Sequence, residues 1–180
     1  MGREMKALLI AVLALAPPLA VARTDNLTQV EAAFTPGDDI AGLITQHIAR
    51  SRESVQMQAY IFTDRRIANA LLAARKRGVA VEVIGDAEQH ANGGLPHLPA
   101  LARAGARVFL DSSHAASHNK IVIVDGGGAR ATVITGSYNF TQSAQSRNAE
   151  NVVVLSGNPR VTGRFVANFE MQRTRSTPWR

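Results

Sequence analysis

Two short apolar runs, Ile121–Val124 and Ala131–Ile134, constrain the fold of this 180-residue chain more than any other feature. Each run is too short for a helix and is rich in β-branched residues, which favours a buried strand. Three glycines, Gly126–Gly128, lie in the link between the runs, and such a link suits a hairpin. The sequence therefore predicts two neighbouring core strands around which the other elements must be placed.

Polar side chains stand at the ends of both predicted strands. His118 and Lys120 open the first strand, Asp125 closes it, and Ser137 and Asn139 follow the second. Because successive side chains of a strand point to opposite faces, His118 and Lys120 project to the same side. An imidazole and an ammonium placed side by side can both reach one phosphate group. The pattern therefore predicts a phosphate-handling site at one end of these strands.

The rest of the chain alternates between apolar strand patterns and helical periodicity. We expect strands at Gln29–Phe34, Ser54–Phe62, Val79–Ile84, Ala106–Leu110, Lys120–Val124, Ala131–Thr135 and Val152–Leu155. We expect helices from Asp38 or Asp39 to about Ser51, at Ile67–Arg77, at Leu98–Ala104, and from Asn158 or Pro159 onward. This alternation predicts an α/β fold in which helices flank a mixed, mostly parallel sheet of about seven strands.

Residues 1–22 have the three parts of a secretory signal peptide: a basic start, the apolar run Ala7–Ala16 and the small-residue pattern Ala20–Ala22. Cleavage after Ala22 would leave residues 23–180 as a single periplasmic or secreted domain without membrane insertion. An uncleaved anchor is the alternative, but the apolar run is short for a membrane span of about 20 residues. Cleavage is the expectation.

Composition narrows the chemistry further. The chain has no cysteine, which excludes disulfides, thiol catalysis and cysteine-bound zinc. Its formal net charge is +6, which suits a polyanionic partner such as nucleic acid or an anionic membrane surface, although a merely soluble basic protein would show the same excess. Lys76 and Lys120 are the only lysines after residue 22, and arginine supplies the other cations. A lysine within the polar cluster therefore indicates that its compact charge has a function there.

Three of the four histidines outside the central stretch, His90, His97 and His114, are expected to play minor parts. His90 and His97 lie in the glycine- and proline-rich stretch Asp86–Leu98, whose spacing matches no metal site, so we expect a loop that borders the site. His114 is expected to be a loop residue rather than a catalyst.

Six residues carry a resemblance to the HKD motif of the phospholipase D superfamily: His118, Lys120, Asp125, Gly136, Ser137 and Asn139. Their order is H-x-K-x4-D followed by G-S-x-N. Beyond the motif, Val122–Val154 is similar to the small exported bacterial endonucleases of that superfamily. The segment Gly126–Thr135 is longer than is usual there, and the excess falls in the glycine turn, where insertion is tolerated.

The resemblance and the chemistry of phosphodiesters assign a role to each residue. A neutral nitrogen of His118 attacks phosphorus to form a phosphohistidine, which water hydrolyses. Lys120, Ser137 and Asn139 are expected to bind the phosphate oxygens. The resemblance places Glu150 beside His118, where a carboxylate would orient the imidazole.

Asp125 and Gly136 are expected to be structural parts of the motif. In a straight strand Asp125 is seven positions from His118, hence on the opposite face and about 23 Å away. It therefore orders the motif or an interface.

The leaving oxygen needs a proton from a second imidazole, and the chain carries a single motif. A single-motif chain resembles the superfamily members that pair two copies, so we expect a homodimer with one shared site. No metal or cofactor is expected, because histidine and lysine fill the roles of a divalent ion.

The expected function is a metal-independent, nonspecific endonuclease acting on DNA or RNA. A phospholipase D-type lipid or small-molecule phosphodiesterase is one alternative, and a noncatalytic nucleic-acid-binding module is another.

Overall fold

A computed structural model describes residues 28–179 of the chain, so the predicted signal peptide at residues 1–22 lies outside the described residues. The strands are Gln29–Thr35 (β1), Ser54–Ala59 (β2), Ala80–Asp86 (β3), Arg107–Asp111 (β4), Lys120–Val124 (β5), Thr132–Gly136 (β6), Glu150–Ser156 (β7) and Thr177–Pro178 (β8). The helices are Ile40–Arg50 (α1), Arg65–Lys76 (α2), Ala87–Ala91 (α3), Leu98–Arg103 (α4), Gln142–Ser146 (α5) and Pro159–Arg175 (α6). None of these helices combines the length and the apolar character that crossing a membrane requires.

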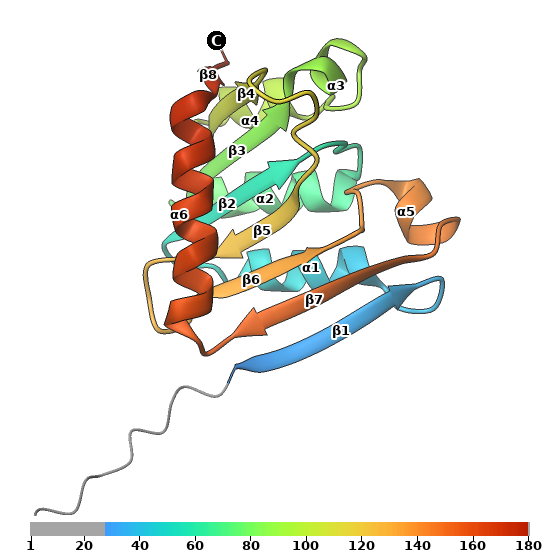
Figure 1. The fold of residues 1–180 in the computed structure, drawn as a ribbon, viewed down its shortest axis with the longest axis vertical. Helices are drawn as coiled ribbons and strands as arrows, with labels where there is room; N and C mark the ends of the chain where they lie inside the picture. The colour runs from blue at the N-terminus through green and yellow to red at the C-terminus, as the bar shows by residue number, and fades with distance from the viewer. Residues whose placement is uncertain (1–27, 180) are drawn as a thin grey trace, which may run out of the picture.

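The eight strands form one mixed sheet in the order β1-β7-β6-β5-β2-β3-β4-β8 (Figure 1). The predicted α/β architecture is confirmed, but the predicted predominance of parallel strands is wrong. Only the β2–β3 and β3–β4 pairs are parallel, and the other five neighbouring pairs are antiparallel. Strands and helices alternate along the chain from β1 to β4, but only β2, β3 and β4 are parallel neighbours, because β1 pairs with β7 at the far edge of the sheet. After that a hairpin joins β5 to β6, and α5 is too short to carry the chain across the sheet.

Helices α1, α2 and α4 cover one face of the sheet, and α6 crosses the other (Figure 1). The alternation of side chains in β5 supplies both layers. Val122 and Val124 pack with the first group of helices, whereas Ile121 and Ile123 pack with Phe169 of α6. Because both of its faces are covered, β5 reads as a continuous apolar run.

Helices α1 and α6 begin where the sequence predicts, and α2 begins at Arg65, two residues before the predicted Ile67. Asp39, Asp64 and Asn158 each cap a helix by accepting hydrogen bonds from backbone N–H groups of its first turn. These caps satisfy donors that have no partner inside the helix.

Asp125 closes β5 at the end of the strand remote from His118. Its carboxylate accepts backbone N–H bonds from Arg52, Glu53 and Ser54, at 3.1, 2.8 and 3.1 Å. Burial would raise the pKa of this carboxyl, but the three hydrogen bonds outweigh burial and lower it. Asp125 therefore ties the end of β5 to the turn that leads into β2.

Two segments are more ordered than the sequence predicts. The stretch expected to be a loop contains α3, and His90 in that helix accepts a hydrogen bond from Trp179 Nε1 at 3.2 Å. After Arg173, α6 continues to Arg175, and β8, for which the sequence predicts no strand, pairs with β4.

Candidate active site

The polar residues singled out in the sequence gather at one end of the sheet. This is the end at which β2 and β6 finish and β5 and β7 begin, so residues from four strands meet there. Lys120 is the first residue of β5 and lies opposite Ala59 of β2. Ser137 directly follows β6, and Glu150 is the first residue of β7. The antiparallel pairing of these strands is what brings the predicted residues together.

Lys120 is buried, with 7% of its surface exposed. Its Nζ donates a hydrogen bond to the backbone oxygen of His118 at 2.7 Å and lies 4.9 Å from the centre of the Tyr60 ring. Burial lowers the pKa of the ammonium to about 8, and the negative charge of Glu150 partly opposes that shift. The side chain is thus a fixed cation that has lost much of its water.

His118 is exposed, and its imidazole packs against the same tyrosine. The ring centres of His118 and Tyr60 are 4.4 Å apart, with the planes tilted by 60°. The hydroxyl of Tyr60 is itself fixed, because it accepts a hydrogen bond from Gln89 of α3 at 3.0 Å. One aromatic ring therefore positions both the imidazole and the ammonium.

Glu150 makes different contacts from those that the resemblance implies. Its carboxylate accepts hydrogen bonds from Ser137 Oγ at 2.6 Å and from Asn148 Nδ2 at 2.9 Å, and neither oxygen is bonded to His118. The Ser137 hydroxyl in turn accepts the backbone N–H of Asn151 at 3.1 Å. In this structure Glu150 therefore orients Ser137 and sets the local negative potential felt by Lys120.

Asn139 is half-buried, and its side-chain oxygen is buried without a hydrogen-bond partner within residues 28–179. Such a group costs free energy unless a ligand or water satisfies it, which is typical of a functional site. Gly136 is required for a different reason. A Cβ atom on it would collide with the backbone of Asn151 and Val152 in β7. Glycine therefore lets β6 and β7 approach closely where Ser137 and Glu150 meet.

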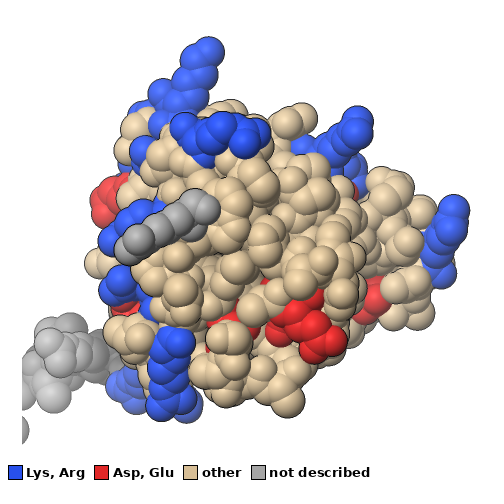
Figure 2. Space-filling model, turned by 90° about the horizontal axis from the view of Figure 1, so that it is seen from above, with Lys and Arg blue, Asp and Glu red and all other residues tan. Residues whose placement is uncertain are grey.

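The basic side chains do not form one continuous patch on the face that Figure 2 presents. Lysines and arginines lie mainly along the left, upper and right edges of that face, and the largest acidic group lies in its lower part (Figure 2). The excess positive charge therefore acts as a diffuse attraction for polyanions. Among residues 28–179, no group of three or more histidine, aspartate or glutamate side chains is placed to hold a metal ion.

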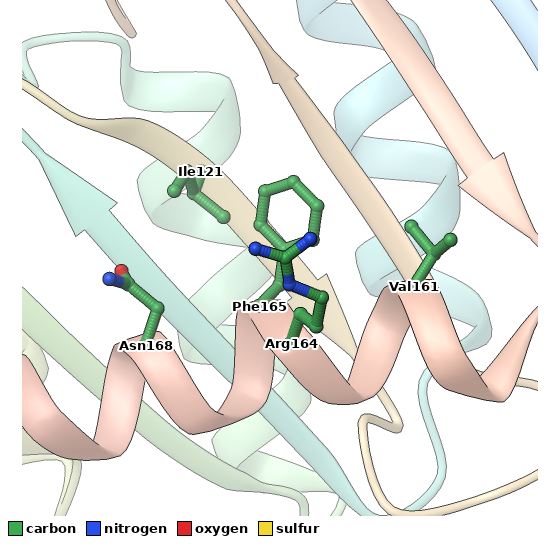
Figure 3. A pocket seen from close by; sticks show the side chains of 5 residues that line it. All are labelled: Ile121, Val161, Arg164, Phe165 and Asn168. Carbon is green, nitrogen blue, oxygen red and sulfur yellow. The ribbon is translucent and has the colours of Figure 1, made fainter.

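A groove of about 370 Å³ lies between α6 and β5. Val161, Arg164, Phe165 and Asn168 line it from α6, and Ile121 lines it from β5 (Figure 3). Since Ile121 follows Lys120 directly, the groove runs close to the cluster but on the α6 side of the sheet.

Sequence reasoning missed Tyr60. The residue directly follows β2, and nothing in its local pattern distinguishes it from a half-buried strand residue. Its position beneath His118 and Lys120 follows from the antiparallel register of β2 and β5. The one sequence feature that could have pointed to Tyr60 was the presence of an aromatic residue near the end of a predicted strand.

Residues 44–173 match the protein family described as cardiolipin synthase, PLD-like domain. A protein of Rickettsia felis named phospholipase D is 39% identical over 128 residues, which cover 71% of this chain and 62% of that protein. A phospholipase D of Rickettsia prowazekii is 35% identical over 149 residues, which cover 83% of this chain and 70% of that protein. The chain thus spans less than two thirds of the length of the R. felis relative.

The crystal structure of Nuc, a phospholipase D family member from Salmonella typhimurium, has the same fold. It superposes with a TM-score of 0.76 at 32% sequence identity, covering 85% of this chain and 99% of Nuc. The match includes the mixed sheet and the helices on both of its faces. The chain therefore belongs to the phospholipase D-like family of phosphodiesterases.

Proposed function

We propose that this protein is a nonspecific endonuclease that hydrolyses the phosphodiester bonds of DNA or RNA. The observation that carries the proposal is the arrangement of His118 and Lys120 on the Tyr60 ring, with the ammonium buried beside an exposed imidazole. A buried cation attracts a phosphate oxygen more strongly than a solvated one. The similarity to Nuc and the positive charge of the chain support a nucleic acid as the substrate.

The proposed reaction has two steps. A neutral nitrogen of His118 attacks phosphorus, and the bond from phosphorus to the leaving oxygen breaks as that oxygen takes a proton from a second imidazole. Water then attacks the phosphohistidine, gives its proton to the second imidazole and releases His118. Lys120 and Asn139 donate hydrogen bonds to the phosphate oxygens as their charge rises in the transition state.

A nuclease assay in chelator tests this function. Purified protein should cleave plasmid DNA in excess EDTA, and His118→Ala should lower kcat by about 10³-fold or more while DNA binding persists. His47→Gln, which changes a histidine on α1, serves as the matched control. Cleavage that stops in EDTA and returns with magnesium would contradict the metal-independent mechanism.

A second candidate is a lipid phosphodiesterase, favoured by the name phospholipase D that both Rickettsia relatives carry. The same two-step chemistry applies, because the motif contacts the phosphodiester and not its substituents. Phosphatidylcholine liposomes incubated beside plasmid DNA separate the candidates. Release of choline without DNA cleavage would replace the first proposal by the second.

We also propose that the active enzyme is a homodimer in which a second copy supplies the second imidazole. The groove beside β5 offers an apolar surface next to the cluster, and we assign it to the partner copy (Figure 3). Arg164→Glu should weaken dimerisation measured by light scattering, whereas Arg65→Glu on α2 should not. A monomeric protein with full activity would overturn this proposal.

Export to the periplasm or medium remains a proposal that rests on residues 1–22. N-terminal sequencing of the protein from its native host should begin at Arg23.

A further inference from the structure

A second ordered histidine lies in the loop between β4 and β5. Nδ1 of His114 lies 2.8 Å from Oδ2 of Asp111, which ends β4 and is only 1% exposed. An ionised carboxylate only accepts hydrogen bonds, so Nδ1 carries the proton and donates it. The other oxygen, Oδ1, accepts the backbone N–H and the hydroxyl of Ser113, both at 2.8 Å. The loop histidine expected from the sequence is therefore fixed in orientation.

Burial would raise the pKa of Asp111, but hydrogen bonds from Ser113 and His114 outweigh it and lower the pKa. The carboxylate is therefore ionised at neutral pH. With Nδ1 held by this carboxylate, Nε2 is the ring nitrogen left to meet a ligand, and it is a donor in the doubly protonated imidazole. Within residues 28–179, Nε2 of His114 has no hydrogen-bond partner, and the side chain is 38% exposed.

His114 borders the same pocket as His118. This pocket of about 190 Å³ is lined by Asp111, His114, Ala116, Ser117, His118, Asn119 and Gln172. The side-chain oxygen of Gln172 is buried there without a hydrogen-bond partner among the described residues. Asp111 and His118 are the other ionisable groups in the pocket lining, and α6 contributes only the uncharged Gln172. An oriented imidazole with one free ring nitrogen therefore stands in a pocket that it shares with His118, where it can meet a ligand.

We propose that this pocket is a subsite for the phosphate that neighbours the scissile phosphate on a polynucleotide strand, with Nε2 of His114 as its donor. The inference rests on the proposed nuclease function. Both Asp111 oxygens are occupied by Ser113 and His114, so the carboxylate orients the imidazole and leaves Nε2 as the group that meets the ligand. A flanking phosphate contact would hold the strand in register with His118 and would carry no sequence information.

Substrates with one and with several phosphates test the subsite. Bis(p-nitrophenyl) phosphate has a single phosphate and cannot occupy it, whereas a single-stranded DNA 12-mer can. At pH 6, His114→Ala should raise KM for the 12-mer about tenfold, leave its kcat nearly unchanged, and leave both constants for the small diester unchanged. His114→Arg should restore KM. The slope of log KM against log salt for the 12-mer should fall by roughly 0.7 in His114→Ala.

His47→Gln serves as the matched control, and thermal melting verifies that each variant folds. Should His114→Ala fail to fold, His114→Gln and His114→Arg carry the comparison. An unchanged KM for the 12-mer overturns the subsite, and so does an equal fall of kcat on both substrates, which would place His114 in the chemical step. If the unaltered protein hydrolyses the small diester but not the 12-mer, the nuclease proposal itself fails.

Discussion

Lys120 is the residue whose titration most directly reports on the site. Burial lowers its pKa to about 8, so the side chain is charged below that pH and neutral above it. If the ammonium binds phosphate, kcat/KM should fall tenfold for each pH unit above about 8, because this constant reports the free enzyme. The fall of kcat should begin at a higher pH than the fall of kcat/KM, because phosphate bound to Lys120 stabilises the charged ammonium.

The control is Lys120→Gln, which removes the titrating group. It should lower kcat by about 10²–10³-fold and abolish the limb near pH 8. A limb that survives in this variant would assign the titration to another group.

Tyr60 provides a prediction about positioning. The ring contacts His118 and Lys120, whereas the hydroxyl, among residues 28–179, is hydrogen-bonded only to Gln89. Tyr60→Phe should therefore retain most of the activity, and Tyr60→Ala should lose about 10²-fold in kcat because the two groups lose their support. Steady-state kinetics on bis(p-nitrophenyl) phosphate checks both variants. Equal losses would mean that the hydroxyl, rather than the ring, carries the effect.

At the scale of elements, β5 begins with the candidate active-site residue Lys120 and ends at Asp125, which ties it to the turn before β2. The Asp125 carboxylate accepts hydrogen bonds from three backbone N–H groups of that turn. Asp125→Asn removes the charge from these hydrogen bonds and should lower the free energy of unfolding by about 1–2 kcal/mol at pH 7. Urea denaturation measures the change, and Glu88→Gln on the exposed face of α3 is the control.

The pH dependence of Asp125 has a definite sign. Its pKa is lowered in the folded chain from the ordinary value of 3.8, so its stabilising contribution is present above that pH. The contribution disappears as the pH falls through the lowered pKa. The difference between the native protein and Asp125→Asn should therefore shrink below pH 4, and a constant difference would contradict the assignment.

Local signals predicted the helices well and the sheet topology less well. Helix starts depend on caps such as Asp39 and Asn158, which act within one turn and are visible in the chain. Strand direction depends on how a connection returns, and the loop before β5 turns the chain back without a helix. The two-residue strand β8 has too few residues to show any periodicity.

The same distinction applies to the site. Lys120 begins β5 and His118 lies two residues before it, so their proximity could be predicted from spacing alone. Tyr60 comes from a strand remote in sequence, and the Asp111–His114 pair depends on how a loop closes. Glu150 was expected beside His118 from the resemblance, but its hydrogen bonds with Ser137 and Asn148 depend on the β6–β7 register. Register between strands is not visible in the sequence.

At the scale of the whole molecule, a shared site can be tested by mixing subunits. If two imidazoles from two copies act together, one inactive copy disables the pair. After subunit exchange, mixtures of native protein and His118→Ala should lose activity as the square of the native fraction. A linear decline would show that each copy works alone. Lys76→Gln, which changes the other lysine of the described chain, should cause no loss in the same mixtures.

The two edge strands of the sheet, β1 and β8, differ in length and in their capacity to pair with a further strand. On one side β8 is two residues long and includes Pro178, which has no N–H to offer to a further strand. On the other side β1 is seven residues long, and its Val30 and Phe34 are 62% and 59% exposed. Within residues 28–179, β1 is therefore the sheet edge that remains open to strand addition. Copies that join through this edge use the same strand on both sides, so this contact, taken by itself, closes at two copies.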